Sequence, residues 1–309
     1  MAACKSSVKP RKIPDSIAAR LRELGPTFDM PAVQALYQPL LAQQPHDAVQ
    51  LHANLAYGEH ERHVLDVYQP DAPAPSGGWP VLVNFHGGGF VRGDKSQRAN
   101  VGWFFAQHGV LTVLPNYRLA PGNQWPSGPQ DVVAAWQWLR ANAARFGGNP
   151  DRIVLVGESA GAAHVAAATL MRRFQPSAGW KIAGAVLLSG PYNARLEGMA
   201  RAQFGVATPD PRNDAYFGTD PATLDAASIV DHIDAEPFPL LISSTERDLV
   251  QMQVQAGELF ARLVSRHGFA PELLVVREHN HFSQGFSIGT GDESVSGPLL
   301  RFLNTLTPS

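Results

Sequence analysis

The fold of this chain is decided by the stretch from Arg152 to Gly161, RIVLVGESAG. An apolar run leads into a G-x-S-x-G pentad, and an alanine-rich segment of helical composition follows. The pentad alone arises easily by chance, but a strand, a tight turn and a helix in this order predict a nucleophile elbow. Such a turn strains the backbone of Ser159 and projects its hydroxyl above the sheet edge. The alternative interpretation is an ordinary glycine-rich helix entry that binds an anion.

Unbroken apolar runs recur along the chain and are typical of parallel strands buried on both faces. Two earlier segments alternate in polarity and predict an antiparallel pair. Helical stretches separate the runs, so we expect an α/β fold with a mostly parallel eight-stranded sheet flanked by helices. The expected strands are Leu51–Tyr57, His63–Tyr68, Val81–Phe85, Val110–Leu114, Arg152–Gly157, Ile182–Leu188, Pro239–Ser243 and Glu272–Val276, and the clearest helices are Gln130–Phe146, Ser159–Arg173 and Val250–His267.

Two segments outside this alternation predict a small cap. Residues 1–50 contain two amphipathic helices, the first capped by Asp15 or Ser16 and the second starting at Asp29. The catalytic domain then covers residues 51–309, with a cap insertion at about 190–238 that is too long for a plain crossover. Its five aromatic residues argue against a disordered linker.

Composition excludes several classes of function. A net charge of −2 gives no reason to expect nucleic acid or a membrane as partner. The single cysteine, Cys4, rules out an intrachain disulfide and a paired-cysteine metal site. A basic cluster (Lys5, Lys9, Arg11, Lys12) is expected to be a solvated tail. No signal peptide or long apolar run is apparent, so the expected location is cytoplasmic, and a homodimer is a possible assembly.

The sequence His86-Gly87-Gly88-Gly89 follows one of the predicted strands. Three consecutive glycines allow backbone N–H groups to converge on one point, as acyl transfer requires when negative charge builds on the carbonyl oxygen. A phosphate-binding loop does not fit, because Asp94 stands where the lysine of that motif belongs. This loop is therefore the candidate oxyanion hole.

A serine nucleophile needs a base, and the base needs a carboxylate to orient it. In this kind of fold the acid and then the histidine follow the serine along the chain. Asp248 follows the predicted strand Pro239–Ser243 and is the leading acid, with Glu246 as second choice. His279 and His281 both follow the last strand, and either could be the base. Two other histidines lie inside predicted helices and are expected to be surface or packing residues: His164 and His267.

Together these motifs resemble the hormone-sensitive-lipase branch of bacterial esterases, which have the α/β-hydrolase fold. The landmarks are His86-Gly87-Gly88-Gly89-Phe90, Asn116-Tyr117-Arg118-Leu119-Ala120-Pro121, Gly157-Glu158-Ser159-Ala160-Gly161 and Asp248. The resemblance implies that the N–H groups of Gly88, Gly89 and Ala160 form the oxyanion hole. It also implies that His86 holds the loop and is not the base.

Some features instead resemble arylformamidases and feruloyl esterases. They include Asn280-His281-Phe282 and Tyr216-Phe217-Gly218. In both groups a phenylalanine or similar residue follows the catalytic histidine, which favours His281 over His279. The resemblance leaves open whether the bond cleaved is an ester or an N-formyl amide.

We therefore expect a serine carboxylesterase for short-acyl or aromatic esters that needs neither a metal nor an organic cofactor. The predicted catalytic residues are Ser159, His281 and Asp248, and the predicted substrate pocket contains Phe90, Trp103, Tyr192 and Phe282. An arylformamidase is the alternative, and a non-catalytic binding protein on the same fold is a second one. Lipase activity is not expected, because no long apolar lid is apparent.

Overall fold

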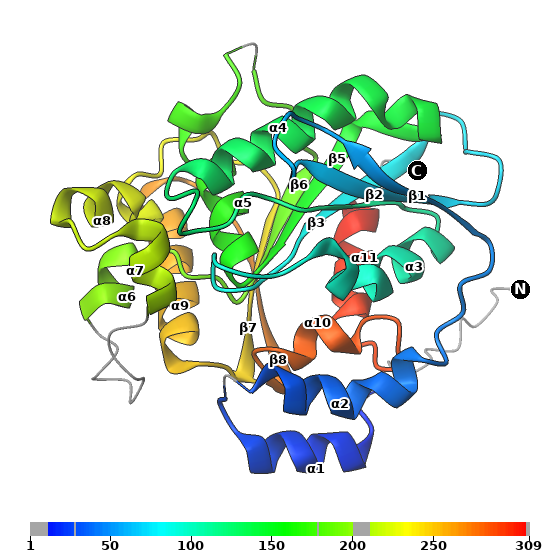
Figure 1. Cartoon of the computed structure of the whole chain (residues 1–309), viewed down its shortest axis with the longest axis horizontal. Coiled ribbons are helices and arrows are strands. Elements are labelled where there is room, and N and C mark those ends of the chain that lie inside the picture. The colour runs from blue at the N-terminus through cyan, green and yellow to red at the C-terminus, as the bar shows by residue number, and fades with distance from the viewer. Residues whose placement is uncertain (1–11, 28, 178, 200–210, 307–309) are drawn as a thin grey trace, which may run out of the picture.

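Eight strands form one sheet in the order β1-β2-β4-β3-β5-β6-β7-β8 (Figure 1). The pairs β1–β2 and β2–β4 are antiparallel, and all other neighbours are parallel. This confirms the predicted mostly parallel eight-stranded sheet. The strands are β1 Val49–Ala56, β2 Val64–Pro70, β3 Trp79–Phe85, β4 Leu111–Pro115, β5 Gly148–Glu158, β6 Gly184–Leu188, β7 Leu240–Arg247 and β8 Glu272–Asn280.

The computed structural model describes residues 12–27, 29–177, 179–199 and 211–306. Cys4 and the basic residues Lys5, Lys9 and Arg11 lie outside the described residues, as does part of the expected cap insertion. Within the described ranges, no helix is both long enough and apolar enough to cross a membrane.

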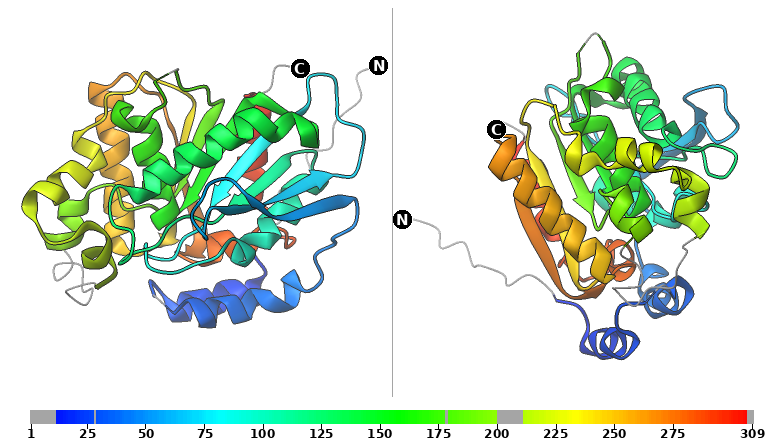
Figure 2. Two further views of the ribbon diagram at one scale, coloured as in Figure 1. Left: turned by 45° about the horizontal axis from the view of Figure 1, so that its top comes forward. Right: turned by 90° about the vertical axis from the view of Figure 1, so that its left-hand side faces the viewer.

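Helices cover both faces of the sheet (Figure 2). One face packs against α4, α5 and α9, and the other packs against α3 and α11. Alternate residues of β3 belong to different cores: Val81 and Val83 lie in the first, and Leu82 lies in the second. Helices on both faces explain why the parallel strands are apolar at nearly every position. These helices are α3 Ala99–Gln107, α4 Ser127–Asn142, α5 Ala160–Leu170, α9 Val250–Arg266 and α11 Ser296–Thr305.

Helix α5 is buried along all of its 11 residues. Its six alanines have small side chains, so the helix lies close against the sheet with little loss of packing. It is therefore a rigid support directly after Ser159.

The two N-terminal helices, α1 (Asp15–Leu24) and α2 (Met30–Leu41), lie at the end of the sheet where the parallel strands finish (Figure 1). They share a small apolar core with Phe286 of α10 (Ser283–Ser287). Asp29 caps α2 by accepting a hydrogen bond from the Ala32 N–H at 3.0 Å. The prediction that Asp15 or Ser16 caps α1 was wrong, because the helix already begins at Asp15 and Pro14 occupies the cap position.

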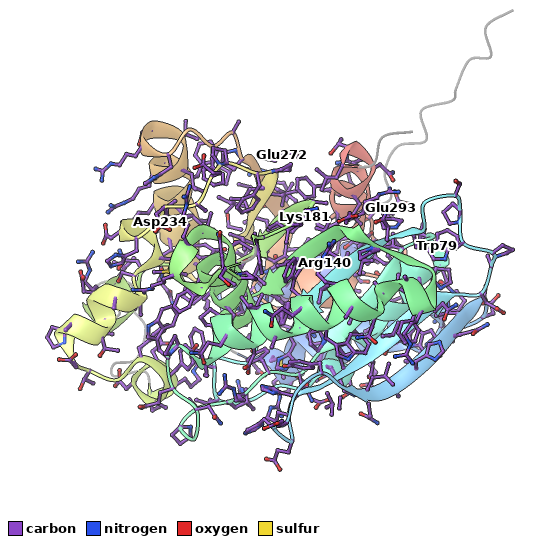
Figure 3. All side chains as sticks on the ribbon, turned by 90° about the horizontal axis from the view of Figure 1, so that it is seen from above. Trp79, Arg140, Lys181, Asp234, Glu272 and Glu293 are labelled. Atoms are coloured by element: carbon purple, nitrogen blue, oxygen red, sulfur yellow. The ribbon has the colours of Figure 1, made fainter. Side chains whose placement is uncertain are left out.

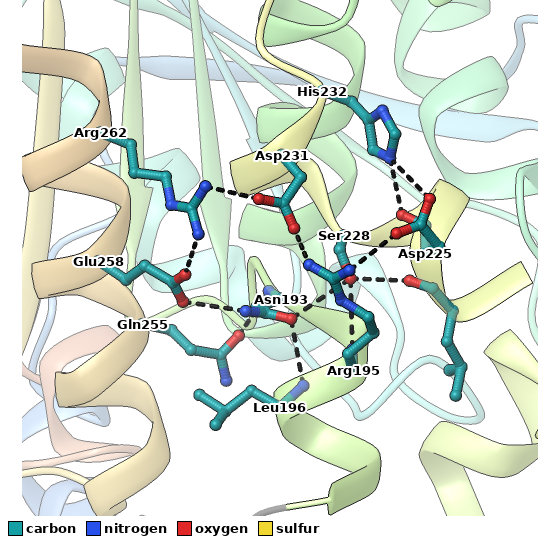
Figure 4. A network of polar contacts seen from close by, with 11 residues as sticks. Asn193, Arg195, Leu196, Asp225, Ser228, Asp231, His232, Gln255, Glu258 and Arg262 are labelled. Atoms are coloured by element: carbon teal, nitrogen blue, oxygen red, sulfur yellow. Dashed lines mark hydrogen bonds and ion pairs between the residues drawn. The ribbon is translucent and has the colours of Figure 1, made fainter. Parts of the chain in front are cut away.

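The connection between β6 and β7 carries three short helices: α6 Ala194–Met199, α7 Pro211–Phe217 and α8 Pro221–Ala227. A polar network fastens its base to α9 (Figure 4). Arg195 of α6 pairs with Asp225 at 2.8 Å and also with Asp231, which in turn pairs with Arg262 of α9 at 2.5 Å. Gln255 of α9 accepts hydrogen bonds from the Tyr192 and Asn193 N–H groups. These ion pairs and hydrogen bonds hold the described part of the insertion against α9.

The two ends of the sheet differ in what they carry. Figure 3 looks onto the end where Trp79 begins β3 and Glu272 begins β8. The elbow of Ser159, Asp248 and His281 all follow the carboxyl ends of their strands, at the opposite end. Ligands of open α/β sheets bind at this carboxyl end.

Candidate active site

Ser159 occupies a sharp turn between β5 and α5. Its backbone has φ 54° and ψ −120°, a conformation that is strained for a residue with a side chain. A Cβ atom on Gly157 would collide with the Gly161 carbonyl, and one on Gly161 would collide with the Phe85 carbonyl. The pentad therefore needs glycine at both ends. Because the turn is this tight, the Ser159 side chain stands out from the end of the sheet.

Ser159, His281 and Asp248 form one hydrogen-bonded chain. The Ser159 Oγ lies 2.9 Å from His281 Nε2, and His281 Nδ1 lies 2.8 Å from Asp248 Oδ1. Of the alternatives that the sequence left open, His279 is fully buried and Glu246 accepts a hydrogen bond from the Glu278 N–H at 2.8 Å. The structure thus brings Asp248 and His281 together with Ser159.

The Asp248 carboxylate is surrounded by donors. It accepts hydrogen bonds from the Thr245 N–H at 3.0 Å, from the Leu249 N–H at 2.9 Å and from the Ser189 hydroxyl. Burial raises the pKa of this carboxyl, but His281 and these donors outweigh the burial and hold the pKa below its usual value. Asp248 is therefore ionised and can orient the imidazole of His281.

The loop after β3 lies against the elbow. A Cβ on Gly87 would lie 3.1 Å from the Ser159 Cβ, and one on Gly88 would collide with the Arg92 carbonyl. Gly88 and Gly89 have φ values of 139° and 60°, which favour glycine. In the described part of the chain, the N–H groups of Gly88, Gly89 and Ala160 donate to no backbone carbonyl. Those three N–H groups are thus available at the pocket beside Ser159.

His86 holds this loop from beneath. Its Nδ1 donates to the Gly87 carbonyl at 2.6 Å, and its ring stacks on Tyr117 with centroids 4.4 Å apart. Burial lowers the pKa of His86 to about 4, so its ring is neutral at pH 7. These contacts agree with the structural role that the resemblance implied for His86, which is to hold the loop.

A second buried serine–histidine–aspartate set lies beside the first. His279 Nδ1 lies 3.0 Å from the Ser283 Oγ, and His279 Nε2 lies 3.1 Å from Asp292 Oδ2 without hydrogen-bond geometry. The Ser283 hydroxyl also accepts from the Asn280 N–H at 2.9 Å. These bonds close the turn that carries His281. No sequence pattern indicates Asp292, because its position depends on how the loop before α11 folds back.

A buried ion pair supports the elbow from the other side. Arg98, at the end of a 3-10 turn (Lys95–Arg98), binds both carboxylate oxygens of Glu158 at 2.5 Å, and both side chains are almost fully buried. The Arg98 guanidinium also lies 4.8 Å from the centre of the Phe286 ring. Glu158 occupies the second position of the pentad, which the G-x-S-x-G motif leaves unspecified. Its charge, directly after an apolar strand, is the only feature of the sequence that could have indicated a buried ion pair.

The pocket beside Ser159 has a volume of about 110 Å³. Of the predicted lining residues, Phe90 and Phe282 contact it, although the Phe90 ring stacks on Tyr216 with centroids 4.5 Å apart. The lining that the sequence did not reveal comes mostly from the N-terminal helix, the insertion and the start of α9. Those residues are Met30, Arg92, Gly93, Gln97, Arg98, Pro191, Arg212, Asn213, Gln251 and Met252.

Two predicted pocket residues do not line it. Trp103 lies on α3 and packs against His46 and Tyr68, on the far face of the sheet. Tyr192 is fully buried at the start of the insertion, where its hydroxyl accepts a hydrogen bond from the Gly190 N–H at 3.1 Å. Both predictions rested on aromatic character and sequence order, which do not specify the face on which a side chain lies.

No group of three or more His, Cys, Asp or Glu side chains that could hold a metal ion occurs among the described residues. The polar groups around the pocket are instead the hydroxyl, imidazole, guanidinium and amide groups described above. This donor set suits acyl transfer to a serine hydroxyl.

A family model described as the alpha/beta hydrolase fold matches residues 82–283. "Probable carboxylic ester hydrolase LipM" of Mycobacterium tuberculosis is 30% identical over 222 residues, which are 66% of this chain and 50% of that protein. "Ethyl acetate hydrolase" of Pseudomonas putida is 33% identical over 112 residues, or 35% of each chain. The chain thus spans half or less of the length of these curated relatives.

Solved structures agree with the fold over nearly the whole chain. Esterase B from Lactobacillus rhamnosis superposes with a TM-score of 0.71 and covers 94% of this chain and 95% of its own, at 18% identity. An identity this low supports the fold and not the substrate.

Proposed function

This chain belongs to the alpha/beta hydrolase fold family, and from that premise we propose that it is a serine carboxylic ester hydrolase for small esters. The observation that carries the proposal is the hydrogen-bonded chain from Ser159 through His281 to Asp248, with distances of 2.9 and 2.8 Å. Relatives named as ester hydrolases support the same reaction class.

In the first step, the Ser159 Oγ attacks the carbonyl carbon of the ester while His281 Nε2 accepts the hydroxyl proton. Asp248 keeps the proton of the imidazole on Nδ1 and stabilises the imidazolium that forms. The tetrahedral intermediate collapses, and the leaving alcohol takes the proton from His281. An acyl-Ser159 ester remains.

In the second step, His281 accepts a proton from water, and the resulting hydroxide attacks the acyl-enzyme. The acid leaves when Ser159 Oγ regains the proton. In both steps the Gly88, Gly89 and Ala160 N–H groups would bind the oxyanion, and each such donor lowers the activation barrier by on the order of 3 kcal/mol. No step uses a metal or an organic cofactor.

The size of the pocket supports a small substrate. A cavity of about 110 Å³ lies below the range of about 300–1,000 Å³ that drug-sized ligands occupy. We therefore expect hydrolysis of p-nitrophenyl esters to fall as the acyl chain lengthens from acetate to palmitate. A steady rise along that series would contradict the proposed substrate class.

Hydrolysis of p-nitrophenyl acetate by the wild type and by Ser159→Ala tests the proposal. We expect turnover by the wild type and a loss of at least about 10⁴-fold in the variant. A wild type without esterase activity would favour a non-catalytic binding protein. Turnover of N-formylkynurenine compared with phenyl acetate tests the scissile bond, and we expect the ester to react faster.

A further inference from the structure

The oxyanion loop (residues 87–90) is held in a conformation that costs free energy. Gly88, Gly89 and Phe90 follow one another with φ values of 139°, 60° and 69°. Glycine adopts a positive φ readily, but Phe90 carries a bulky side chain, for which this conformation is rare. A strained residue keeps such a conformation only where its surroundings impose it. The contacts of Phe90 therefore decide whether the N–H groups of Gly88 and Gly89 stay in place.

The Phe90 side chain packs against the insertion. Its ring lies nearly parallel to that of Tyr216, with an angle of 2° between the planes and centroids 4.5 Å apart. Phe217 adds an edge-on contact with centroids 5.0 Å apart. Both residues belong to α7 and, like Phe90, are buried. Paired aromatic rings attract each other beyond what the burial of their area contributes. The stack therefore fixes the Phe90 side chain and, through it, the backbone of the loop.

Tyr216 is itself fixed to the catalytic domain. Its hydroxyl accepts a hydrogen bond from the Gly128 N–H of α4 at 3.1 Å, and its carbonyl accepts one from the Trp125 N–H at 2.9 Å. Arg212 lies four residues earlier on α7, so both side chains are on one face of the helix. A Cβ atom on Gly89 would lie 2.9 Å from the Arg212 Cδ. The helix α7 thus contacts two successive residues of the oxyanion loop.

We propose that Tyr216 is a positioning residue, whose ring holds Phe90 at positive φ and so keeps the Gly88 and Gly89 N–H groups directed at the carbonyl oxygen of the substrate. The inference rests on the proposed esterase function and adds that the insertion completes the oxyanion hole. Tyr216 is not among the described residues that line the pocket, so it acts through Phe90. Its effect falls on the transition state, in which that oxygen carries the charge, more than on binding of the neutral ester.

Removal of the ring tests the proposal. Tyr216→Leu should lower kcat for p-nitrophenyl acetate about 10-fold to 100-fold and change KM less than about 3-fold, because misplaced donors bind the charged oxygen less well. Tyr216→Phe keeps the ring and loses only the hydroxyl, so it should retain most of the kcat. Phe269→Leu is the control. It removes a similarly buried ring, paired edge-on with Phe238, ahead of β8 at the opposite end of the sheet, and should leave kcat unchanged.

Affinity for a transition-state analogue measures the oxyanion hole separately. The Ser159 Oγ adds to the carbonyl carbon of a trifluoromethyl ketone, His281 takes the hydroxyl proton, and the carbonyl oxygen becomes the oxyanion. The Ki of this inhibitor should therefore rise in Tyr216→Leu by about the factor by which kcat/KM falls. Phe90→Leu removes the other ring of the stack and should cause a similar loss. The double variant should lose little more than either single variant, because both changes remove the same contact.

Thermal melting identifies the variants that are folded, and Phe90→Leu takes the place of Tyr216→Leu if that protein does not fold. A folded Tyr216→Leu that keeps kcat within about 3-fold of the wild type would overturn the inference. An equal loss in Tyr216→Phe or Phe269→Leu, or additive losses in the double variant, would overturn it as well. In each case hydrolysis by the wild type upholds the esterase, whereas a wild type that cleaves no ester would overturn the proposed function.

Discussion

Two serine–histidine–aspartate sets lie side by side in this molecule, and their histidines are two residues apart in the chain. In one, His281 joins Ser159 and Asp248 at 2.9 and 2.8 Å. In the other, His279 lies 3.0 Å from Ser283 and 3.1 Å from Asp292. In both sets burial raises the pKa of the aspartate carboxyl. The neighbouring histidine and the hydrogen bonds that the carboxylate accepts outweigh burial and hold this pKa below its usual value.

The surroundings of the two serines differ. Ser159 has a strained backbone, is partly exposed and faces the pocket beside Gly88 and Gly89. Ser283 is fully buried in α10, and its hydroxyl is used by the Asn280 backbone. We therefore propose that the same three types of side chain form a reactive site in the first set and a structural brace in the second. Access to substrate and the nearby candidate oxyanion hole would account for the difference.

The largest expected effect separates the two histidines. His281→Gln should lower kcat/KM for p-nitrophenyl acetate on the order of 10⁴-fold, because Ser159 loses its base. His279→Gln should lower it no more than about 10-fold and should instead lower the melting temperature. Equal losses of activity in two folded variants would break the distinction.

The two aspartates should differ in the same sense. Asp248→Asn should lower kcat about 10³-fold to 10⁴-fold, since an amide favours the wrong tautomer of His281. Asp292→Asn should leave kcat within about 10-fold of the wild type. Thermal melting of both proteins serves as the control for folding, and a larger loss of kcat in Asp292→Asn would contradict the comparison.

The first serine–histidine–aspartate set could be predicted from the sequence, whereas the second could not. Unbroken apolar runs predicted the six later strands, since burial on both faces leaves a simple pattern, and alternating polarity predicted the first two. Chain order and strand ends pointed to Asp248, and a resemblance favoured His281 over its neighbour. Asp292 could not be predicted, because a loop folding back over 13 residues from His279 leaves no pattern in the sequence.

The pocket was the least predictable part. Trp103 and Tyr192 were expected there for their aromatic rings, but they pack in the cores on either side of the sheet. Arg212 and Met30 line it although one belongs to the insertion and the other to the N-terminal helices. Such contacts depend on how distant segments dock, and no local pattern encodes that.

His164 is a buried histidine outside both sets, and its Nε2 has no partner in the described part of the chain. Burial lowers the pKa of His164 to about 3, well below that of an unfolded histidine. The unfolded state therefore binds more protons between about pH 3 and 6.5, so stability should fall as pH drops through this range, by at most about 5 kcal/mol from His164.

The His164→Leu variant tests this pH dependence. It should unfold less readily on acidification than the wild type, with little loss of stability at pH 7.5. Urea melts at several pH values measure both quantities. An unchanged dependence on pH would show that His164 does not titrate on unfolding as expected.

The smallest expected effect concerns the brace itself. Ser283→Ala removes a hydroxyl that bonds to the Asn280 backbone and leaves the His279 ring without this neighbour. The free energy of unfolding should fall by about 1–3 kcal/mol, as for a buried hydrogen bond left unmade. The kcat for p-nitrophenyl acetate should stay within a few-fold of the wild type, and a loss comparable to that of Ser159→Ala would refute the structural assignment.

Covalent labelling shows which of the two serines is the nucleophile. The wild type would be treated with a fluorophosphonate, and the modified peptide located by mass spectrometry. We predict one adduct, on Ser159, that persists in Ser283→Ala and disappears in Ser159→Ala. An adduct on Ser283, or a folded wild type that takes up no label, would contradict the claim.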